Sequence, residues 1–149
     1  MARIKLDYPD ETYTFSTELQ VRFDDINAGM HLAHERVVSF VGEARSRFLE
    51  SLGLSEIGSD TQPGVIVSDL AVVYKAEARL RDVLRLDVGI ADPNRYGGDV
   101  VCRVVRAADD TLVAVAKVNL VFFDYRGAKR PVPAPTEFTR AITSESRSD

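Results

Sequence analysis

The histidines of this 149-residue chain, His31 and His34, lie in one short polar segment together with Asn27 and Gly29. An imidazole has an ordinary pKa near neutrality, so histidine is the most frequent general base in enzymes. The segment precedes a helical pattern, and the first turn of a helix leaves backbone N–H groups without partners. A base beside such donors suits the attack of water on a carbonyl carbon, because the N–H groups can hold the developing oxyanion. We therefore expect the chemistry of the protein here.

The patterns on either side of this segment predict the elements that hold it in place. Alternating residues predict a strand over residues 12–23, and apolar residues at helical spacing predict an amphipathic helix over residues 35–52. The stripe that should face the core consists of Val37, Val41, Ala44, Phe48 and Leu52. Four more strands are predicted over residues 64–76, 83–91, 99–107 and 111–124.

This order of elements predicts an α+β domain in which a five-stranded antiparallel sheet wraps one long central helix. One helix can cover only the concave face of such a sheet, so its edges need another cover, for which a second copy of the chain is the economical solution. We interpret residues 1–149 as one domain, with a core at about residues 12–125 and a partly disordered terminal segment over residues 131–149.

Composition and charge argue against several classes of protein. The net charge of −4 and the pI near 5.2 argue against a nucleic-acid partner. No apolar stretch approaches the ~18 residues of a membrane span, and the N-terminus lacks the apolar core of a signal peptide, so we expect a cytoplasmic protein without a membrane partner. Cys102 lies in an apolar run and is expected to be a small buried side chain. Two histidines and one cysteine do not supply the four ligands of a closed metal site.

Four groups of residues, taken in order, resemble a known family. They are Asp25-Ile26-Asn27-Ala28-Gly29-Met30-His31-Leu32, Glu43-Ala44-Arg45, Tyr74-Lys75-Ala76-Glu77-Ala78 followed by Asp82, and Val113-Ala114. Their order and spacing resemble the hotdog-fold acyl-CoA thioesterases of the 4-hydroxybenzoyl-CoA thioesterase group over residues 14–124. The resemblance implies hydrolysis of an acyl thioester of coenzyme A (CoA) or acyl carrier protein. It also implies no metal or cofactor apart from the CoA of the substrate, and a homodimer or homotetramer.

The resemblance further implies roles for the polar segment. The family commonly has an Asp in the position of Asn27, where it acts as nucleophile or base, and an amide can do neither. Asn27 can still orient water, polarise the carbonyl or cap the turn. His31 and His34 match histidines of other branches, and with Glu43 they are the candidates for the missing carboxylate's work. Each also has a structural interpretation: His31 closes the turn, His34 begins the helix, and Glu43 pairs with Arg47 at i+4.

Further candidates would bind the oxyanion or the substrate. The backbone N–H groups near Gly29 and Met30 are candidates for the oxyanion. Ser68 and Asp69 interrupt an apolar strand, where alternation predicts opposite faces for them, and one of the two could line an acyl pocket from a partner subunit. The cations that could contact CoA phosphates are Lys75, Arg79 and Arg81, with a solvated surface as the alternative for each.

The sequence thus predicts an acyl-CoA thioesterase that releases free acid and CoA from a small or medium acyl-CoA. Two alternatives stay open. One is a non-catalytic acyl-CoA-binding or sensing protein, which Asn27 favours, and the other is a hotdog hydratase or dehydratase.

Overall fold

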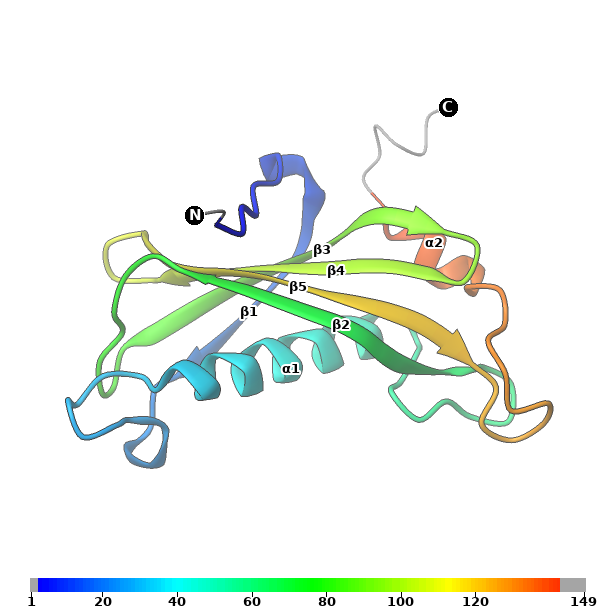
Figure 1. Ribbon diagram of the computed structural model, residues 1–149, viewed down its shortest axis with the longest axis horizontal. Helices are drawn as coiled ribbons and strands as arrows, with labels where there is room; N and C mark the ends of the chain where they lie inside the picture. The colour runs from blue at the N-terminus through cyan, green and yellow to red at the C-terminus, as the bar shows by residue number, and fades with distance from the viewer. Residues whose placement is uncertain (1–2, 143–149) are drawn as a thin grey trace.

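The computed structural model of the protein describes residues 3–142. Five strands form one antiparallel sheet with the order β1-β3-β4-β5-β2. The strands are β1 (Tyr13–Gln20), β2 (Gly64–Tyr74), β3 (Val83–Asn94), β4 (Gly97–Arg106) and β5 (Thr111–Phe123). Two α-helices, α1 (His34–Ser51) and α2 (Thr136–Arg140), and two short 3-10 turns, Asp10–Thr12 and Phe23–Asp25, complete the described chain. The sheet curls around α1, which confirms the predicted α+β architecture (Figure 1).

The core lies between α1 and the concave face of the sheet. Phe48 of α1 is almost fully buried, and its ring centroid lies 5.7 Å from that of Phe15 on β1. The other buried apolar residues of α1 are Val37, Phe40, Val41, Ala44 and Leu49. Facing them, β3, β4 and β5 contribute alternate Leu, Val and Ile side chains, together with the buried Cys102. This packing fixes how α1 is rotated, and therefore where its N-terminal turn lies.

The C-terminal end of α1 differs from the prediction. The helix ends at Ser51, and Leu52 is its C-terminal cap residue with a half-buried side chain. Leu49 and Leu54 are the buried leucines at this end, with exposed fractions of 0% and 4%. Leu52 was wrongly predicted to be a full core residue, because the chain leaves helical geometry at that position and the stripe does not extend to it.

Two strand boundaries also differ from those expected. β1 ends at Gln20. Val21, which continued its pattern, is 0% exposed, while Phe23 begins a 3-10 turn and is 71% exposed. β3 and β4 extend toward each other, with Asn94 paired to Gly97, so the loop expected over residues 93–98 is a tight hairpin at residues 95–96.

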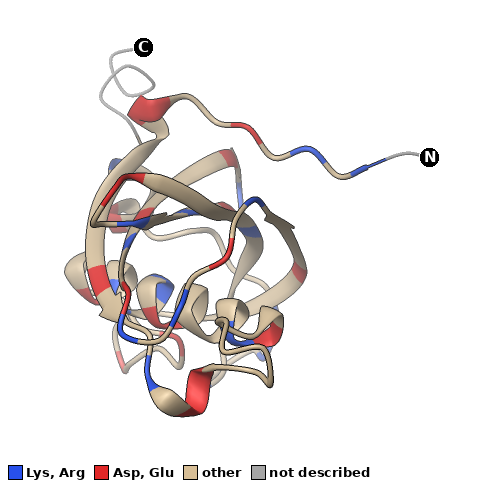
Figure 2. Cartoon of the chain, turned by 90° about the vertical axis from the view of Figure 1, so that its left-hand side faces the viewer, with Lys and Arg blue, Asp and Glu red and all other residues tan. Residues whose placement is uncertain are grey.

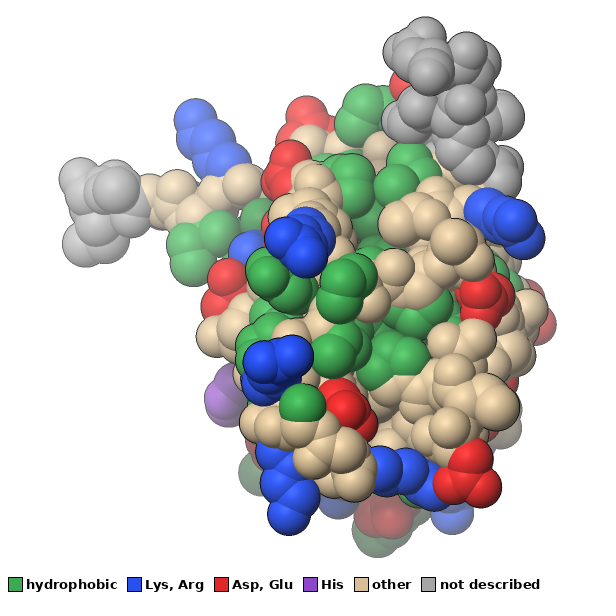
Figure 3. Space-filling view, turned by 90° about the vertical axis from the view of Figure 1, so that its right-hand side faces the viewer, with side chains coloured by type: hydrophobic (Ala, Val, Ile, Leu, Met, Phe, Trp, Pro, Cys, Tyr) green, Lys and Arg blue, Asp and Glu red, His purple; other side chains and the backbone are tan. Residues whose placement is uncertain are grey.

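The chain after Pro131 contributes to the fold up to Ile142. Phe138 of α2 is 0% exposed, and its ring centroid lies 5.0 Å from that of Phe122 on β5. Figure 3 shows the end of the molecule where α2 lies, with apolar side chains gathered on it. Residues 143–149 of the expected terminal segment lie outside the described part of the chain.

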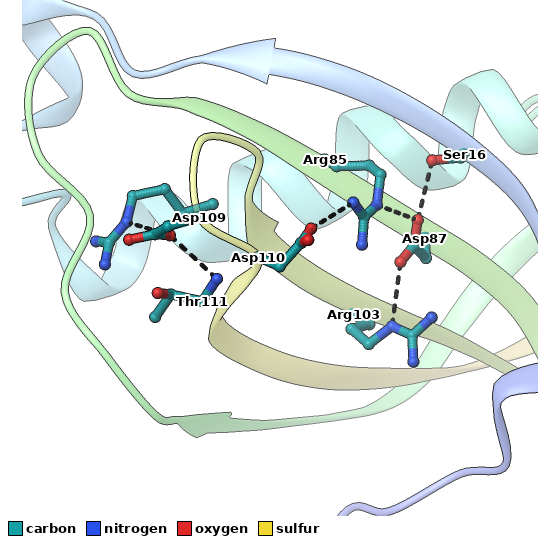
Figure 4. Close-up of polar contacts among 8 residues, drawn as sticks. Ser16, Arg85, Asp87, Arg103, Asp109, Asp110 and Thr111 are labelled. Atoms are coloured by element: carbon teal, nitrogen blue, oxygen red, sulfur yellow. Dashed lines mark hydrogen bonds and ion pairs between the residues drawn. The ribbon is translucent and has the colours of Figure 1, made fainter.

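The convex face of the sheet carries a polar network centred on Asp87, which is only 6% exposed (Figure 4). Its carboxylate accepts hydrogen bonds from Ser16, Arg85 and Arg103, and Arg103 also pairs with Asp10. A buried carboxylate needs such partners to offset its lost hydration. The network joins β1, β3 and β4 and fastens the segment before β1 to the sheet.

Within residues 3–142 no helix is long and apolar enough to cross a membrane.

Candidate active site

The polar segment before α1 forms a closed turn around Asn27. The Oδ1 atom of Asn27 accepts hydrogen bonds from the backbone N–H groups of Gly29 (3.0 Å) and His31 (3.3 Å). The backbone of Asn27 bonds to the carbonyl of His31 and to the N–H of Met30, which lies in the left-handed region at φ 66°. Asn27 therefore caps the turn, and the N–H groups of Gly29 and Met30 are used inside it.

His31 lies at the end of this turn and faces a carboxylate. Its Nε2 atom is 3.1 Å from Oε2 of Glu77, and its side chain is 30% exposed. Backbone pairing holds the two segments together, because His31 forms an antiparallel bridge with Arg79 and the N–H of Leu32 donates to the carbonyl of Ala78. Glu77 was not among the sequence-predicted site residues. Glu77 belongs to the motif Tyr74-Lys75-Ala76-Glu77-Ala78, which contributes to the family resemblance. Only the folded chain brings this motif beside His31.

His34 is the first residue of α1 and lies in more open surroundings. Its side chain is 80% exposed, and Nδ1 is 3.3 Å from Oε2 of Glu35. The Tyr74 hydroxyl donates to the His34 carbonyl, and burial followed by the Glu35 charge raises the pKa of Tyr74. The α1 N-terminus has no side-chain cap within the described chain, so first-turn N–H groups can bind an anionic ligand atom.

Glu43 lies on the α1 face that looks toward β1. Its carboxylate pairs with Arg47 at 2.8 Å, and Arg47 also donates to Thr17. Glu43 and Arg47 line a pocket of about 370 Å³ with Arg22, Asp25 and Phe40 among its walls. The interaction of Glu43 is therefore the i+4 ion pair with Arg47, in a pocket whose walls do not include His31 or Glu77.

Ser68 and Asp69 contact the same neighbouring strand. Ser68 donates to Oδ1 of Asn119, while Asp69 pairs with Lys117 and accepts the Asn119 N–H. The alternation that predicted opposite faces fails here because the register of β2 shifts between Val67 and Asp69, as in a β-bulge. The hydrogen bond from Lys117 lowers the pKa of Asp69.

The three cations proposed for CoA phosphates lie on one loop but point to different partners. Arg79 is 3.8 Å from Glu77, beside His31. Arg81 is in the left-handed region at φ 72° and bonds through its backbone to Val21. Lys75 lines a pocket beneath the segment before β1. Figure 2 shows this end of the molecule, where acidic and basic residues alternate rather than forming one basic patch. Within residues 3–142 no cluster of three or more His, Cys, Asp or Glu side chains could hold a metal ion.

A five-stranded antiparallel sheet curled around one long helix, with a polar turn at the helix N-terminus, defines the hotdog class of folds. The sequence profile of the thioesterase-like superfamily matches residues 21–142, and the chain belongs to this superfamily.

Three individual proteins are also similar to this chain. The chain is similar to the acyl-CoA thioesterase YbgC of Haemophilus influenzae, with 25% identity over 130 residues that cover 86% of this chain and 93% of the relative. Among solved structures, the 1,4-dihydroxy-2-naphthoyl-CoA thioesterase Slr0204 from Synechocystis has a TM-score of 0.75 and 22% identity, covering 86% of this chain and 94% of that one. The SAV2348 protein of Staphylococcus aureus, solved with CoA, has a TM-score of 0.76 and 19% identity, covering 85% and 80%. The two structural likenesses show a shared fold.

Proposed function

We propose that this protein hydrolyses the thioester of a small or medium acyl-CoA, releasing the free acid and CoA, at the turn formed by residues 27–31. The observation that carries the proposal is the His31–Glu77 pair beside the N-terminus of α1, in a member of the thioesterase-like superfamily. The similarity to an acyl-CoA thioesterase over most of both chains supports CoA as the carrier.

The proposed reaction uses water and the residues of this turn, with no metal and no cofactor besides the substrate's CoA. His31 accepts a proton from a water molecule as its oxygen attacks the thioester carbonyl carbon. The N–H groups of Gly29 and Met30 do not serve as oxyanion donors, because they already donate to Asn27. First-turn N–H groups of α1 stabilise the oxyanion instead. When the intermediate collapses, the carbon–sulfur bond breaks and the His31 proton passes to the thiolate of CoA.

The proposed binding of CoA uses cations near the turn. Arg79, with a side chain 65% exposed, and Arg81 lie on the loop that carries Glu77. Phosphate groups of CoA can therefore approach them while the thioester is beside His31.

We further propose a cytoplasmic homodimer, which can pair into a homotetramer. Strand β2 is an edge of the sheet, so half of its backbone groups face away from β5. Large apolar side chains are exposed along it, namely Ile66, Val67, Leu70 and Tyr74. Pairing of β2 with the β2 strand of a second copy would cover this edge. Because Tyr74, at the end of β2, donates to the His34 carbonyl, such a seam would lie beside the α1 N-terminus.

The test is a free-thiol release assay with a panel of aromatic and aliphatic acyl-CoAs. The proposal predicts saturable release of CoA from at least one of them, with the free acid as co-product. Saturable binding of acyl-CoA without release would contradict the proposal and indicate a binding or sensing protein. Consumption of an enoyl-CoA without thiol release would indicate the hydratase alternative.

A further inference from the structure

The backbone around Glu77 is fastened beside the turn that carries His31. The Glu77 carbonyl accepts a hydrogen bond from Nη1 of Arg106 at 2.8 Å, and the next residue, Ala78, is 1% exposed. The Ala78 carbonyl accepts the Leu32 N–H at 2.8 Å, immediately after His31. These bonds tie the backbone of the loop to the turn on either side of the pair, and the Glu77 side chain, which is 61% exposed, reaches His31 at 3.1 Å from this fixed position.

The two nitrogens of the His31 ring lie in different surroundings. Nε2 faces the Glu77 carboxylate, which is an acceptor only, so this contact is a hydrogen bond when Nε2 carries the hydrogen. In the neutral ring Nδ1 then has the free lone pair. Nδ1 faces Gly29, where a Cβ atom would lie 3.4 Å from it. Because glycine has no Cβ, residue 29 places no side-chain atom against this nitrogen.

We propose that Glu77 is a positioning residue that holds His31 in the Nε2–H tautomer, so that Nδ1, beside Gly29, is the atom that accepts the proton of the attacking water. The assignment of Nδ1 as the base rests on the proposed thioesterase function. Glu77 thereby supplies the carboxylate that is absent at Asn27, from another segment and in an orienting role. In the step itself, one water hydrogen moves to Nδ1, the water oxygen bonds to the carbonyl carbon, and the proton on Nδ1 later goes to the leaving thiolate.

The chain offers a matched control for this pair. His34 and Glu35 also form a His–Glu contact, at 3.3 Å, but both side chains are more than two-thirds exposed and the residues are adjacent in sequence. No backbone bridge between separate segments is needed to form that contact. Glu35→Gln therefore removes the same charge from the same end of the molecule while leaving His31 and Glu77 in place.

The first measurement needs no substrate. Two-bond proton–nitrogen correlation spectra of ¹⁵N-labelled protein are recorded at about pH 8.5, above the ordinary titration range of histidine. The spectrum of His34→Gln lacks the His34 signals and so shows which signals belong to His31. We expect a predominantly Nε2–H tautomer for His31 in the wild type and in Glu35→Gln, and a mixture of tautomers in Glu77→Gln, since an amide can either donate or accept. An unchanged His31 tautomer in Glu77→Gln would overturn the positioning role.

The second measurement is the kinetics of CoA release by the same proteins. Glu77→Gln should lower kcat roughly 10- to 100-fold, the usual range for residues that orient a functional histidine, with little change in KM. Glu35→Gln should change kcat much less than Glu77→Gln does, because its contact with His34 does not involve His31. Gly29→Ala should also lower kcat while retaining the His31 tautomer, because the methyl group covers Nδ1 and the Gly29 backbone is outside the left-handed region.

Equal losses of kcat in Glu77→Gln and Glu35→Gln, or wild-type kcat in Gly29→Ala, would overturn the assignment of Nδ1 as the base. If the wild type releases no CoA at all, the proposed function fails and the base assignment fails with it. The spectra still decide separately whether Glu77 sets the tautomer of His31.

Discussion

At Asn27 the chain has an amide in the position where the thioesterases it resembles commonly have a carboxylate. The amide oxygen accepts two backbone hydrogen bonds and shapes the turn that carries His31. The structural interpretation of Asn27, a turn cap, thus describes its contacts, and we propose that neighbouring residues do the catalytic work. His31 and Asn27 could be predicted because they belong to one contiguous motif.

Substitutions of Asn27 separate its structural contribution from any chemical one. Asn27→Ala should lower the free energy of unfolding by about 0.5–2 kcal/mol, as the loss of a capping side chain does. It should also reduce turnover without changing the shape of the pH–rate profile. Asn27→Asp should keep the stability, because a carboxylate accepts the same two bonds, and should raise turnover by restoring the family's carboxylate. Denaturant unfolding and CoA release measure both effects. A pH–rate profile that loses a limb in Asn27→Ala would show that we have assigned the wrong role.

Other residues of the site could not be found from local patterns. Glu77 reaches His31 only because residues 31 and 79 form a β-bridge, which is a long-range property of the fold. Ser68 and Asp69 do not follow the period-two alternation because the register of β2 shifts between Val67 and Asp69. Motif spacing therefore located the turn, while tertiary pairing determined which charged groups accompany it.

Among the elements, α1 positions the turn through its buried stripe. The helical period of Val37, Val41, Ala44 and Phe48 was sufficient to predict the buried face. The end of the helix was harder to predict, because the Leu52 backbone turns out of the helix before its side chain can enter the core. The strand boundaries could be predicted only in outline, since the hairpin at residues 95–96 depends on how far β3 and β4 pair.

The stability of α1 packing tests this assignment. Phe48→Ala should lower the free energy of unfolding by roughly 3–5 kcal/mol, because it removes a fully buried ring that contacts Phe15. Leu52→Ala should cost less than about 1.5 kcal/mol, since its side chain is only half buried. Urea unfolding of both variants decides the matter. Equal losses would mean that Leu52 is a core residue after all.

The β4–β5 hairpin gives a prediction for acid stability. Hydrogen bonds from Arg106 and Thr111 lower the pKa of Asp109 to about 2 (Figure 4). Because the folded pKa lies below the unfolded value of about 4, the stabilisation is present above pH ~4 and is lost as the pH falls toward 2. Asp109→Asn should therefore make the acid limb of the stability–pH curve shallower. A curve of unchanged slope would show that the solvent-exposed pair contributes nothing measurable.

In the whole molecule, β1 and β2 are the two edges of the sheet, and the β2 edge is the one that carries a row of exposed large apolar side chains. Leu70, 45% exposed, lies at the middle of this edge. Light scattering at micromolar concentration should report a dimer or tetramer, and Leu70→Lys should shift it toward the monomer, because charged side chains on an edge oppose strand pairing. A wild-type monomer would remove the argument that a second copy adjoins the site.

The pH dependence of CoA release by the wild type and His31→Ala tests directly whether His31 is the base of a thioester hydrolase. The wild-type rate should fall on the acid side of neutrality, where histidine becomes protonated. His31→Ala should lose turnover by roughly 10²- to 10⁴-fold and should no longer show this limb. Turnover by His31→Ala close to that of the wild type, with the same pH–rate profile, would show that His31 is not the base and would leave His34 or Glu43 as the candidates.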